Sequence, residues 1–593
     1  MDASQLFKRA ERAFADNQPD QARAHLSSLL SHGGEDPVVL HLLALVERRA
    51  GRFDEALTAF QRAFAVAPPD AQLLSNHANL LLALGRLDEA LAQYDAALAL
   101  SPKSPGLRLN RALLLQRAER HDEAIAELDA LAAADGDEPK IRSARAISLH
   151  RLGRLEEAAA EFDAALARDS HRLVALHGRA RVALERGEAD ASGHYRKALQ
   201  GAKGNLDLLL GLSEALVAEG DSAGLSILRQ AVDQHRDWYA GHEVLARMRA
   251  EAGERDCFGD HYVAALEARP GDFEMRKSYC HTLTLAGRHS EALAVLCAGP
   301  GEARLDPQSQ LSEALLLEAL GERKAALRLI DQLEKDGYID PALPLAHGRI
   351  VLADGDPAQA ANIFERLVTT YPDDIAGWAH LDLTWRLLGN SRHHWLSGRD
   401  GLIAQRSLDV PGDFLEDLAV LLQSLHRTRS HPIGQSLRGG TQTRGRLFSR
   451  SEPEIKTLYH ALDAAVRAHF DGLPAFDAGH PLLRHKNAQI TIQGAWSVRL
   501  TDEGFHISHI HPQGILSSAC HISLTDIVGE EGWLELGRPP RGLNLDLGPL
   551  ATFRPVPGSV VLFPSYMFHG TTPFTKGERL TVAFDVIANG ASL

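Results

Sequence analysis

The chain has 593 residues, of which 45% are hydrophobic and 24% are charged, and its formal net charge is −15. These proportions are ordinary for globular proteins, and the length exceeds what a single hydrophobic core usually reaches. An acidic chain without runs of lysine or arginine is a poor match for a phosphate backbone, so nucleic acid is not an expected partner.

The first residues, MDASQLFKRAERAFADNQPD, alternate charged with small apolar side chains and lack the continuous apolar core of a signal peptide. No run approaches the roughly 18 apolar residues that cross a bilayer. The 4 cysteines show no CxxC spacing, which argues against a zinc knuckle and against a disulfide framework. We therefore expect a cytoplasmic protein without a membrane partner.

The first two thirds of the chain repeat one phrase. The segment GRFDEALTAFQRAFAVAP begins at Gly51, GRLDEALAQYDAALALSP at Gly85, and GRLEEAAAEFDAALARDS at Gly153. The same slot recurs every 33 or 34 residues, and it is filled by Asn17, Gly51, Gly85, Glu119, Gly153, Gly187, Gly220, Gly253, Gly287, Gly321, Gly355 and Gly389. Glycine and asparagine tolerate the left-handed backbone conformation of a turn between two helices.

Within a repeat, an alanine follows this slot after five residues and an aromatic residue after nine, as at Ala56 and Phe60. These features resemble the tetratricopeptide repeat, and the match runs from the N-terminus to roughly Asn390. The resemblance implies an all-α superhelix of helix pairs over residues 1–400, with an extended concave face. Such a face usually binds a protein or peptide, which is the partner we expect; a spacer or dimerisation arm is the alternative.

The period of the sequence changes near residue 400. Residues 401–430 are expected to form a connecting helix, and a further helix is expected at roughly 453–470. Beyond it, QITIQGAWSVRL, SVVLFP and RLTVAFDVI alternate apolar and polar residues, with a break at Gly494. Short strands between glycine and proline turns in residues 431–593 indicate a β-sandwich or jelly roll.

The stretch HISHIHPQG, residues 506–514, holds three histidines. Residues two apart on a strand project from the same face, so His509 and His511 could bind one metal ion. A third ligand could come from His569, at the end of GSVVLFPSYMFH. Arg579 follows ten residues later and opens the next predicted strand, where a buried cation would need an anion.

These features together resemble the C-terminal core of the iron(II)- and 2-oxoglutarate-dependent oxygenases, in the bacterial branch in which that core follows tetratricopeptide repeats. The phrases that carry the resemblance are QSLRGGTQTRGRLF, GAWSVRL, HIHPQGILSSACHISL, GWLELG and PGSVVLFPSYMFHGTTPFTKGERLTVAFDV. The resemblance implies a double-stranded β-helix, or jelly roll, that uses Fe(II) and 2-oxoglutarate. His509 and His569 match two histidines of the facial triad, and Arg579 matches the arginine that binds the far carboxylate of 2-oxoglutarate.

Two positions depart from the family pattern. His511 stands where most relatives have a carboxylate. Either His511 is the third ligand, or two histidines and water hold the metal, or Glu535 or Asp546 replaces it. We expect His511. The pair Cys520 and His521 stands where relatives tend to have two tyrosines, and we expect His521 to donate a hydrogen bond to 2-oxoglutarate.

Other residues are assigned to the surroundings of the site. Thr581 or Ser559 is expected to assist in binding 2-oxoglutarate, and His506 is expected to lie beside the metal without binding it. The stretch RGGTQTRG lacks the order of a phosphate-binding loop. We expect it to line the mouth of the oxygenase site, where Arg438 or Gln442 could contact substrate.

The sequence therefore predicts a 2-oxoglutarate-dependent dioxygenase that hydroxylates a protein or peptide recruited by the repeats. One alternative is a non-catalytic adaptor whose oxygenase barrel is degenerate. Another is a three-histidine dioxygenase that does not use 2-oxoglutarate, against which Arg579 argues, since such an enzyme needs no carboxylate clamp.

Overall fold

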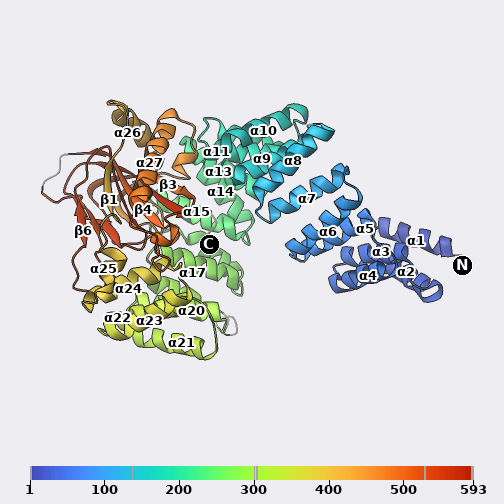
Figure 1. Cartoon of the computed structure of the whole chain (residues 1–593), viewed down its shortest axis with the longest axis horizontal. Coiled ribbons are helices and arrows are strands. Elements are labelled where there is room, and N and C mark those ends of the chain that lie inside the picture. Colours follow the sequence, from blue (N-terminus) through green and yellow to red (C-terminus); the bar gives the residue numbers. More distant parts are fainter. Residues whose placement is uncertain (1–2, 137, 300, 302–304, 526–528, 589–593) are drawn as a thin grey trace. The chain divides into compact units, whose positions relative to one another are not determined.

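The computed structural model describes residues 3–136, 138–299, 301, 305–525 and 529–588. The chain forms two compact units, one of residues 1–183 with 200–202 and the other of residues 184–199 with 203–593. Helices fill the first unit, and the second unit adds a β-sheet domain to the remaining helices (Figure 1). Within the described ranges, no helix is both long enough and apolar enough to cross a membrane.

The first unit is a series of helix pairs. Its helices are α1 (Ala3–Ala15), α2 (Pro19–Gly33), α3 (Pro37–Arg49), α4 (Phe53–Val66), α5 (Ala71–Ala83), α6 (Leu87–Leu100), α7 (Pro105–Arg117), α8 (His121–Asp135), α9 (Pro139–Arg151), α10 (Leu155–Arg168) and most of α11 (Leu173–Glu185). The turn slots have positive φ, which is 57° at Asn17 and 56° at Glu119. The left-handed turn is therefore present even where the slot holds no glycine.

The aromatic residue of a repeat packs on a glycine of a neighbouring helix. Phe162 is buried, and a Cβ added at Gly178 would lie 2.1 Å from its ring. In the second unit, Phe364 packs on Gly348 in the same way. The aromatic side chain thus fills the space that the missing Cβ leaves, which lets the helices approach closely.

The second unit begins with further helices of the same kind. They are α12 (Ala191–Gly201), α13 (Leu206–Glu219), α14 (Ala223–Gln234), α15 (Tyr239–Glu251), α16 (Asp260–Ala268), α17 (Phe273–Leu285), α18 (His289–Cys297), α20 (Pro307–Ala319), α21 (Arg323–Lys335), α22 (Ala342–Ala353), α23 (Pro357–Thr370), α24 (Ile375–Leu387) and α25 (Arg392–Ser397). Capping aspartates such as Asp272 and Asp374 accept backbone N–H groups where their helices begin.

The β domain begins inside the segment expected to be a connecting helix. Ala404–Ser407 forms β1, which pairs with β7, and helix α26 follows at Phe414–Leu425. The remaining elements are β2 (Leu437–Gln442), η1 (Leu447–Ser449), α27 (Pro453–Gly472), η2 (Leu483–His485), β3 (Ile490–His506), β4 (Leu516–Leu524), β5 (Leu534–Leu536), η3 (Arg541–Leu543), β6 (Ala551–Phe553), β7 (Ser559–Pro564), β8 (His569–Thr571) and β9 (Arg579–Ala588).

The strands form two antiparallel sheets. One has the order β1-β7-β4-β9-β3-β2, and the other has the order β6-β5-β8. The pairing of β3 with β9 shifts between Gln493 and Ala495, where Gly494 has a φ of 65°. This bulge accounts for the break in the alternation of the sequence. A helical repeat region followed by an antiparallel β domain is the predicted architecture, and the β domain is consistent with a jelly roll.

Two sets of contacts join the β domain to the repeats of the second unit. Residues 426–451, which we call the strap, follow the turns of successive repeats. The strap donates hydrogen bonds to carbonyls at the ends of repeat helices, from Ser451 N to Arg186 O at 3.1 Å, Arg427 Nη1 to Ala218 O at 2.7 Å, and Arg429 N to Glu251 O at 2.9 Å. Helix C-termini leave such carbonyls without helical partners, so they are natural acceptors.

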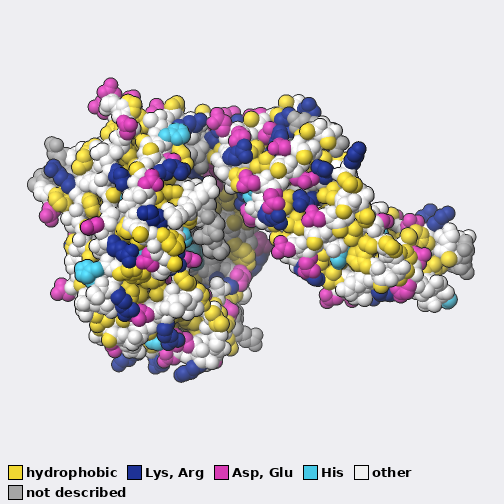
Figure 2. All heavy atoms as spheres, viewed as in Figure 1, with side chains coloured by type: hydrophobic (Ala, Val, Ile, Leu, Met, Phe, Trp, Pro, Cys, Tyr) yellow, Lys and Arg dark blue, Asp and Glu magenta, His cyan; other side chains and the backbone are white. Residues whose placement is uncertain are grey.

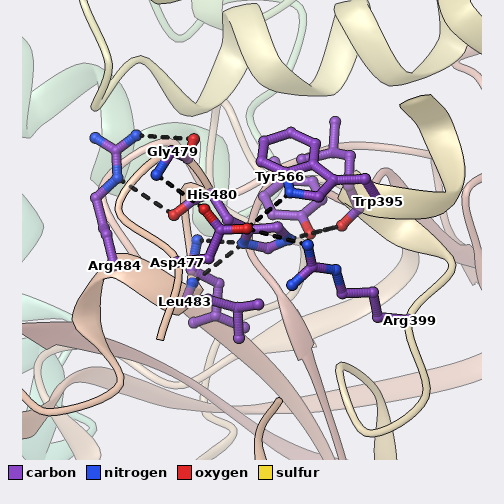
Figure 3. A network of polar contacts seen from close by, with 10 residues as sticks. Trp395, Arg399, Asp477, Gly479, His480, Leu483, Arg484 and Tyr566 are labelled. Carbon is purple, nitrogen blue, oxygen red and sulfur yellow. Dashed lines mark hydrogen bonds and ion pairs between the residues drawn. The ribbon is translucent and has the colours of Figure 1, made fainter. Parts of the chain in front are cut away.

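The second set of contacts surrounds α25 (Figure 3). Asp477 accepts hydrogen bonds from Trp395 Nε1 at 2.8 Å and from Arg399 Nη2 at 3.0 Å. Tyr566, which follows β7, donates to the carbonyl of Leu396 at 2.5 Å. The end of the repeats is thus fastened to the strand connection that leads to β8.

Candidate metal and cosubstrate site

His509, His511 and His569 come together in the β domain. Each offers one ring nitrogen, and these atoms lie within 4.8 Å of one another. The ring centroids of His509 and His569 are 4.2 Å apart, and those of His511 and His569 are 4.9 Å apart. The structure therefore brings together the three residues proposed from the sequence as metal ligands.

The expectation that His509 and His511 lie on a regular strand is wrong. Strand β3 ends at His506, and His509 contacts His569 through an isolated β-bridge. The backbone N of each residue donates to the carbonyl of the other, at 3.0 and 2.9 Å. This bridge orients His509, and the Nε2 atoms of His509 and His511 still lie 3.1 Å apart.

Backbone carbonyls set the tautomers of two histidines. His509 Nδ1 lies 2.8 Å from the carbonyl oxygen of Ile507, and His569 Nδ1 lies 3.1 Å from that of Met567. Each Nδ1 donates its proton there, which leaves the lone pair on Nε2. An unprotonated Nε2 with its partner nitrogen held in place is the arrangement that metal-binding histidines need.

His511 is held by a carboxylate. Its Nδ1 lies 2.6 Å from Asp585 Oδ1, and Ser517 donates to the same oxygen at 2.9 Å. Asp585 is on β9, opposite Ser517 in the pairing of β4 with β9. His511 lacks the negative charge that a carboxylate ligand would bring to this position. The carboxylate of Asp585 supplies a negative charge one hydrogen bond behind the His511 ring. A carboxylate that accepts the second N–H of a metal ligand fixes the ring and raises its basicity.

The neighbours of the three histidines include Ser436, which no spacing signal in the sequence indicates. Its Oγ lies 3.0 Å from His506 Nδ1 and 3.2 Å from His509 Nε2. His506 lies beside the cluster and is not one of the three grouped residues among those described.

The two alternative carboxylates do not join the histidines. Arg538 donates to both carboxylate oxygens of Glu535, at 2.6 and 2.7 Å. Over the described ranges, the histidine cluster contains neither Glu535 nor Asp546. The geometry favours His511 over either of them as the third candidate ligand.

Two histidines of the cluster, His509 and His569, are neutral without a metal. Burial, with a smaller contribution from His511, lowers the pKa of His509 to about 3. Burial, followed by repulsion from His509 and His511, holds the pKa of His569 well below its usual value. Because a histidine must be neutral to bind a metal, both rings are ready ligands at physiological pH.

Arg579 is a buried cation. It is 4% exposed, and its guanidinium donates to the carbonyl of Gly532 and lies 3.3 Å from His521 Nδ1. Among the described residues, its Nε has no hydrogen-bond partner, and neither has Nε2 of the fully buried His521. Burial lowers the pKa of Arg579 to about 10. In the described part of the chain, no carboxylate forms a salt bridge with it.

The other predicted residues have different surroundings. Thr581 is buried and lies opposite His521 in the pairing of β4 with β9. Ser559 Oγ donates to the carbonyl of Val556 at 2.8 Å. Gln442 lines a cavity of about 330 Å³ beside the strap, which none of the three candidate ligands lines. Cys520 is fully buried, and burial raises its pKa to about 12.

Buried histidines elsewhere predict acid sensitivity. Burial lowers the pKa values of His380, His469 and His480 to about 4 each, from the ordinary 6.5. Below pH 6.5 the unfolded chain then binds more protons than the folded chain, so stability should fall as pH falls. Each histidine should cost about 1.4 kcal/mol at pH 5.5. Unfolding free energies at pH 7.5 and 5.5 should therefore differ less for His469→Gln than for the wild type; equal differences would contradict this.

Comparisons with known proteins agree with this division of the chain. The family model "Putative 2OG-Fe(II) oxygenase" matches residues 494–585. Models of the tetratricopeptide repeat match residues 41–105, 311–375, 81–147 and 139–164. A search of curated proteins found no match.

Solved structures of several tetratricopeptide-repeat proteins are similar to part of this chain. One from Parabacteroides merdae is 18% identical, with 39% of this chain and 92% of that chain covered and a TM-score of 0.35. The C-terminal part of another, from Cytophaga hutchinsonii, is 15% identical, with 38% and 94% covered and a TM-score of 0.33. A protein from Thermus thermophilus is 24% identical, with 36% and 100% covered and a TM-score of 0.24.

The sequence matches and the fold identify the two parts of the chain. Repeated helix pairs with a left-handed turn slot occupy the N-terminal region, and the antiparallel β domain contains the matched oxygenase segment. The chain therefore carries tetratricopeptide repeats in its N-terminal region and a domain of the family described as "Putative 2OG-Fe(II) oxygenase" at its C-terminus.

Proposed function

We propose that this protein is an iron(II)- and 2-oxoglutarate-dependent dioxygenase that hydroxylates a protein or peptide substrate. The observation that carries the proposal is the buried Arg579, which forms no salt bridge among the described residues, in the same β domain as three histidines whose rings are held by hydrogen bonds. A cluster of three histidines that binds a metal would, by itself, fit many classes of enzyme. A carboxylate-binding cation with it is specific to a cosubstrate that carries a distant carboxylate.

The three histidines fit ferrous iron. Imidazole is a suitable ligand for iron, and three protein ligands leave coordination positions for cosubstrate and dioxygen. His509, His511 and His569 would hold the metal through Nε2, since each Nδ1 faces a carbonyl or a carboxylate. Asp585 would compensate part of the metal charge through His511.

The surroundings of Arg579 fit the far carboxylate of 2-oxoglutarate. Two groups there lack hydrogen-bond partners in the part of the chain that the structure describes, the Nε–H of Arg579 and the Nε2 of His521. Leaving such groups buried without partners costs free energy, which an anion would recover through charge-assisted hydrogen bonds. A three-histidine dioxygenase that does not use 2-oxoglutarate leaves this unpaired cation unexplained.

When bound, iron, 2-oxoglutarate and dioxygen supply the oxidising chemistry, which converts a C–H bond to C–OH and gives succinate and carbon dioxide. The residues of the chain would bind these groups and shield them from water. Phe563 is fully buried with its ring 4.7 Å from that of His569, and the Trp496 ring lies 5.6 Å from His511. These apolar walls would keep water away from the reacting centre.

The repeat region would bring the substrate. The tetratricopeptide models together cover residues 41–164 and 311–375, and such repeats form surfaces for proteins and peptides. This part of the proposal follows from architecture, whereas the reaction follows from the histidines and Arg579.

Turnover tests the proposal. Purified protein with ferrous iron, ascorbate and 2-oxoglutarate should form succinate in air, and a suitable peptide substrate should accelerate it. His569→Ala should abolish succinate formation, because it removes one ligand. Iron binding without any 2-oxoglutarate turnover would contradict the proposal and favour the non-catalytic adaptor.

A further inference from the structure

An arginine of the strap lies next to the histidine cluster. Arg438 is on β2, two residues after Ser436, whose hydroxyl contacts His509. The residue between them, Leu437, pairs with His506 of β3. Ser436 immediately precedes β2, and Arg438 Nη1 donates to the carbonyls of Gln435 and Leu437, the residues on either side of Ser436.

A second arginine reaches the same place from the repeats. Arg255 lies between α15 and α16, and its Nη2 donates to the carbonyl of His431 at 2.6 Å. Burial, followed by repulsion from Arg438, lowers the pKa of Arg255. Burial, followed by repulsion from both arginines, lowers the pKa of His431 to about 4. Both arginines are anchored on the same short stretch of the strap, Arg255 on the carbonyl of His431 and Arg438 on that of Gln435.

Within the described residues, these two arginines lack the acidic partners that neighbouring arginines have. Arg249 pairs with Glu254 at 2.6 Å, and Arg444 pairs with Glu251. Arg438 Nη1, by contrast, donates to two backbone carbonyls, at 2.8 Å each. Over the described ranges, neither Arg255 nor Arg438 forms a salt bridge.

The lack of acidic partners stands out in an acidic chain. The formal net charge is −15, and acidic and basic side chains are interspersed on the face shown in Figure 2. Two like charges held together without a counter-charge repel each other, so an anion bound between them is stabilised.

We propose that Arg255 and Arg438 together bind a carboxylate side chain of an acidic peptide segment, beside the residue that the oxygenase site modifies. The modification rests on the proposed function, but the binding of the acidic segment does not. The site is built by both parts of the second unit, since Arg255 belongs to the repeats and Arg438 to the strap.

The chemistry favours a peptide carboxylate over other anions. A nucleic-acid backbone needs a stripe of cations, and this chain offers two arginines within a strongly acidic whole. The far carboxylate of 2-oxoglutarate already has Arg579, which is buried, whereas Arg255 and Arg438 are partly exposed. Ile507, which is 40% exposed and donates its N–H to Ser436 O at 3.0 Å, adds an apolar contact for a neighbouring peptide residue.

Binding of a model peptide tests the proposal. A fluorescein-labelled peptide of alternating glutamate and alanine is titrated with the full chain at low salt, without iron or 2-oxoglutarate, and anisotropy is recorded. The counterpart with glutamine for glutamate should bind at least roughly tenfold more weakly. Arg255→Gln and Arg438→Gln should each weaken binding of the glutamate peptide roughly tenfold, as expected for one charged hydrogen bond.

Matched variants separate this site from general charge attraction. Arg438→Lys keeps the charge and should retain most of the affinity, while Arg541→Gln, at an exposed arginine of η3, should leave it unchanged. Arg579→Met should also leave peptide binding intact. A failure of the 2-oxoglutarate assignment can therefore be distinguished from a failure of the peptide site at Arg255 and Arg438. Equal affinities for the two peptides, or full binding by both glutamine variants, would overturn the proposal. Tighter binding of a phosphoserine peptide, lost in the same variants, would replace the carboxylate with a phosphate.

Discussion

Replacing Arg579 with methionine is expected to abolish 2-oxoglutarate binding and to stabilise the protein without cosubstrate. The guanidinium is 4% exposed and lacks an anion in the described part of the chain. Methionine is apolar and of similar length, so it removes a buried charge with little loss of packing. A buried polar group without its partner costs roughly 1–3 kcal/mol, and removing that cost from a unit of this size should raise the unfolding temperature by roughly 1 °C per kcal/mol.

Thermal unfolding with and without the metal and cosubstrate measures both effects. In the wild type, 2-oxoglutarate with a redox-inert divalent metal should raise the unfolding temperature, and in Arg579→Met it should not. Arg579→Lys keeps the charge but loses the two parallel donors. Its affinity for 2-oxoglutarate should therefore lie between those of the wild type and Arg579→Met. A cosubstrate shift that survives in Arg579→Met would show that 2-oxoglutarate binds elsewhere.

Replacing Asp585 with asparagine is expected to weaken iron binding roughly 10–100-fold. Asparagine has nearly the same shape, but it removes the negative charge that faces His511 Nδ1 at 2.6 Å. The His511 ring should be held less firmly in its orientation, and its Nε2 should be less basic. The change should be clear in equilibrium metal titrations of the apo protein, so the result does not depend on turnover.

Two controls accompany that titration. Ser517→Ala removes a hydrogen bond to Asp585 and should weaken metal binding less than Asp585→Asn does. Asp546→Asn removes an alternative carboxylate ligand and should change nothing. Unchanged affinity in Asp585→Asn together with a large loss in Asp546→Asn would assign the third ligand to Asp546 and not to His511.

The repeats are readily predicted from sequence because their signals are local. A residue that tolerates positive φ stands in nearly every turn slot, and a small residue and an aromatic residue keep fixed distances from it. Even the exception at Glu119 adopts a φ of 56°, because the two helices on either side impose the turn.

The candidate site is only partly predictable from sequence, because its geometry depends on contacts between distant segments. The histidines and Arg579 carry recognisable spacing. The bridge between His509 and His569, however, forms outside regular strands, and Ser436 reaches His509 from the strap. Strand alternation puts Asp585 on the face of Arg579, but its bond to His511 depends on a strand pairing that spacing does not reveal.

The contacts of the repeats give them a second role. From the sequence alone, the repeat array is expected to present a surface that is free to bind a partner. In the second unit, carbonyls at the ends of successive repeat helices accept hydrogen bonds from the strap, and the strap carries Ser436 and Arg438. We infer that these repeats also support the oxygenase site, so their loss should impair it even for substrates that do not need them.

We propose that the three histidines and Arg579 form one iron and 2-oxoglutarate site. Anaerobic addition of ferrous iron and then 2-oxoglutarate should produce the weak visible charge-transfer band of the chelate. The band should be lost in His569→Ala, which lacks a metal ligand, and in Arg579→Ala, which lacks the carboxylate clamp. Iron binding without a band would contradict the 2-oxoglutarate site, and a protein that binds no iron would contradict the metal site itself.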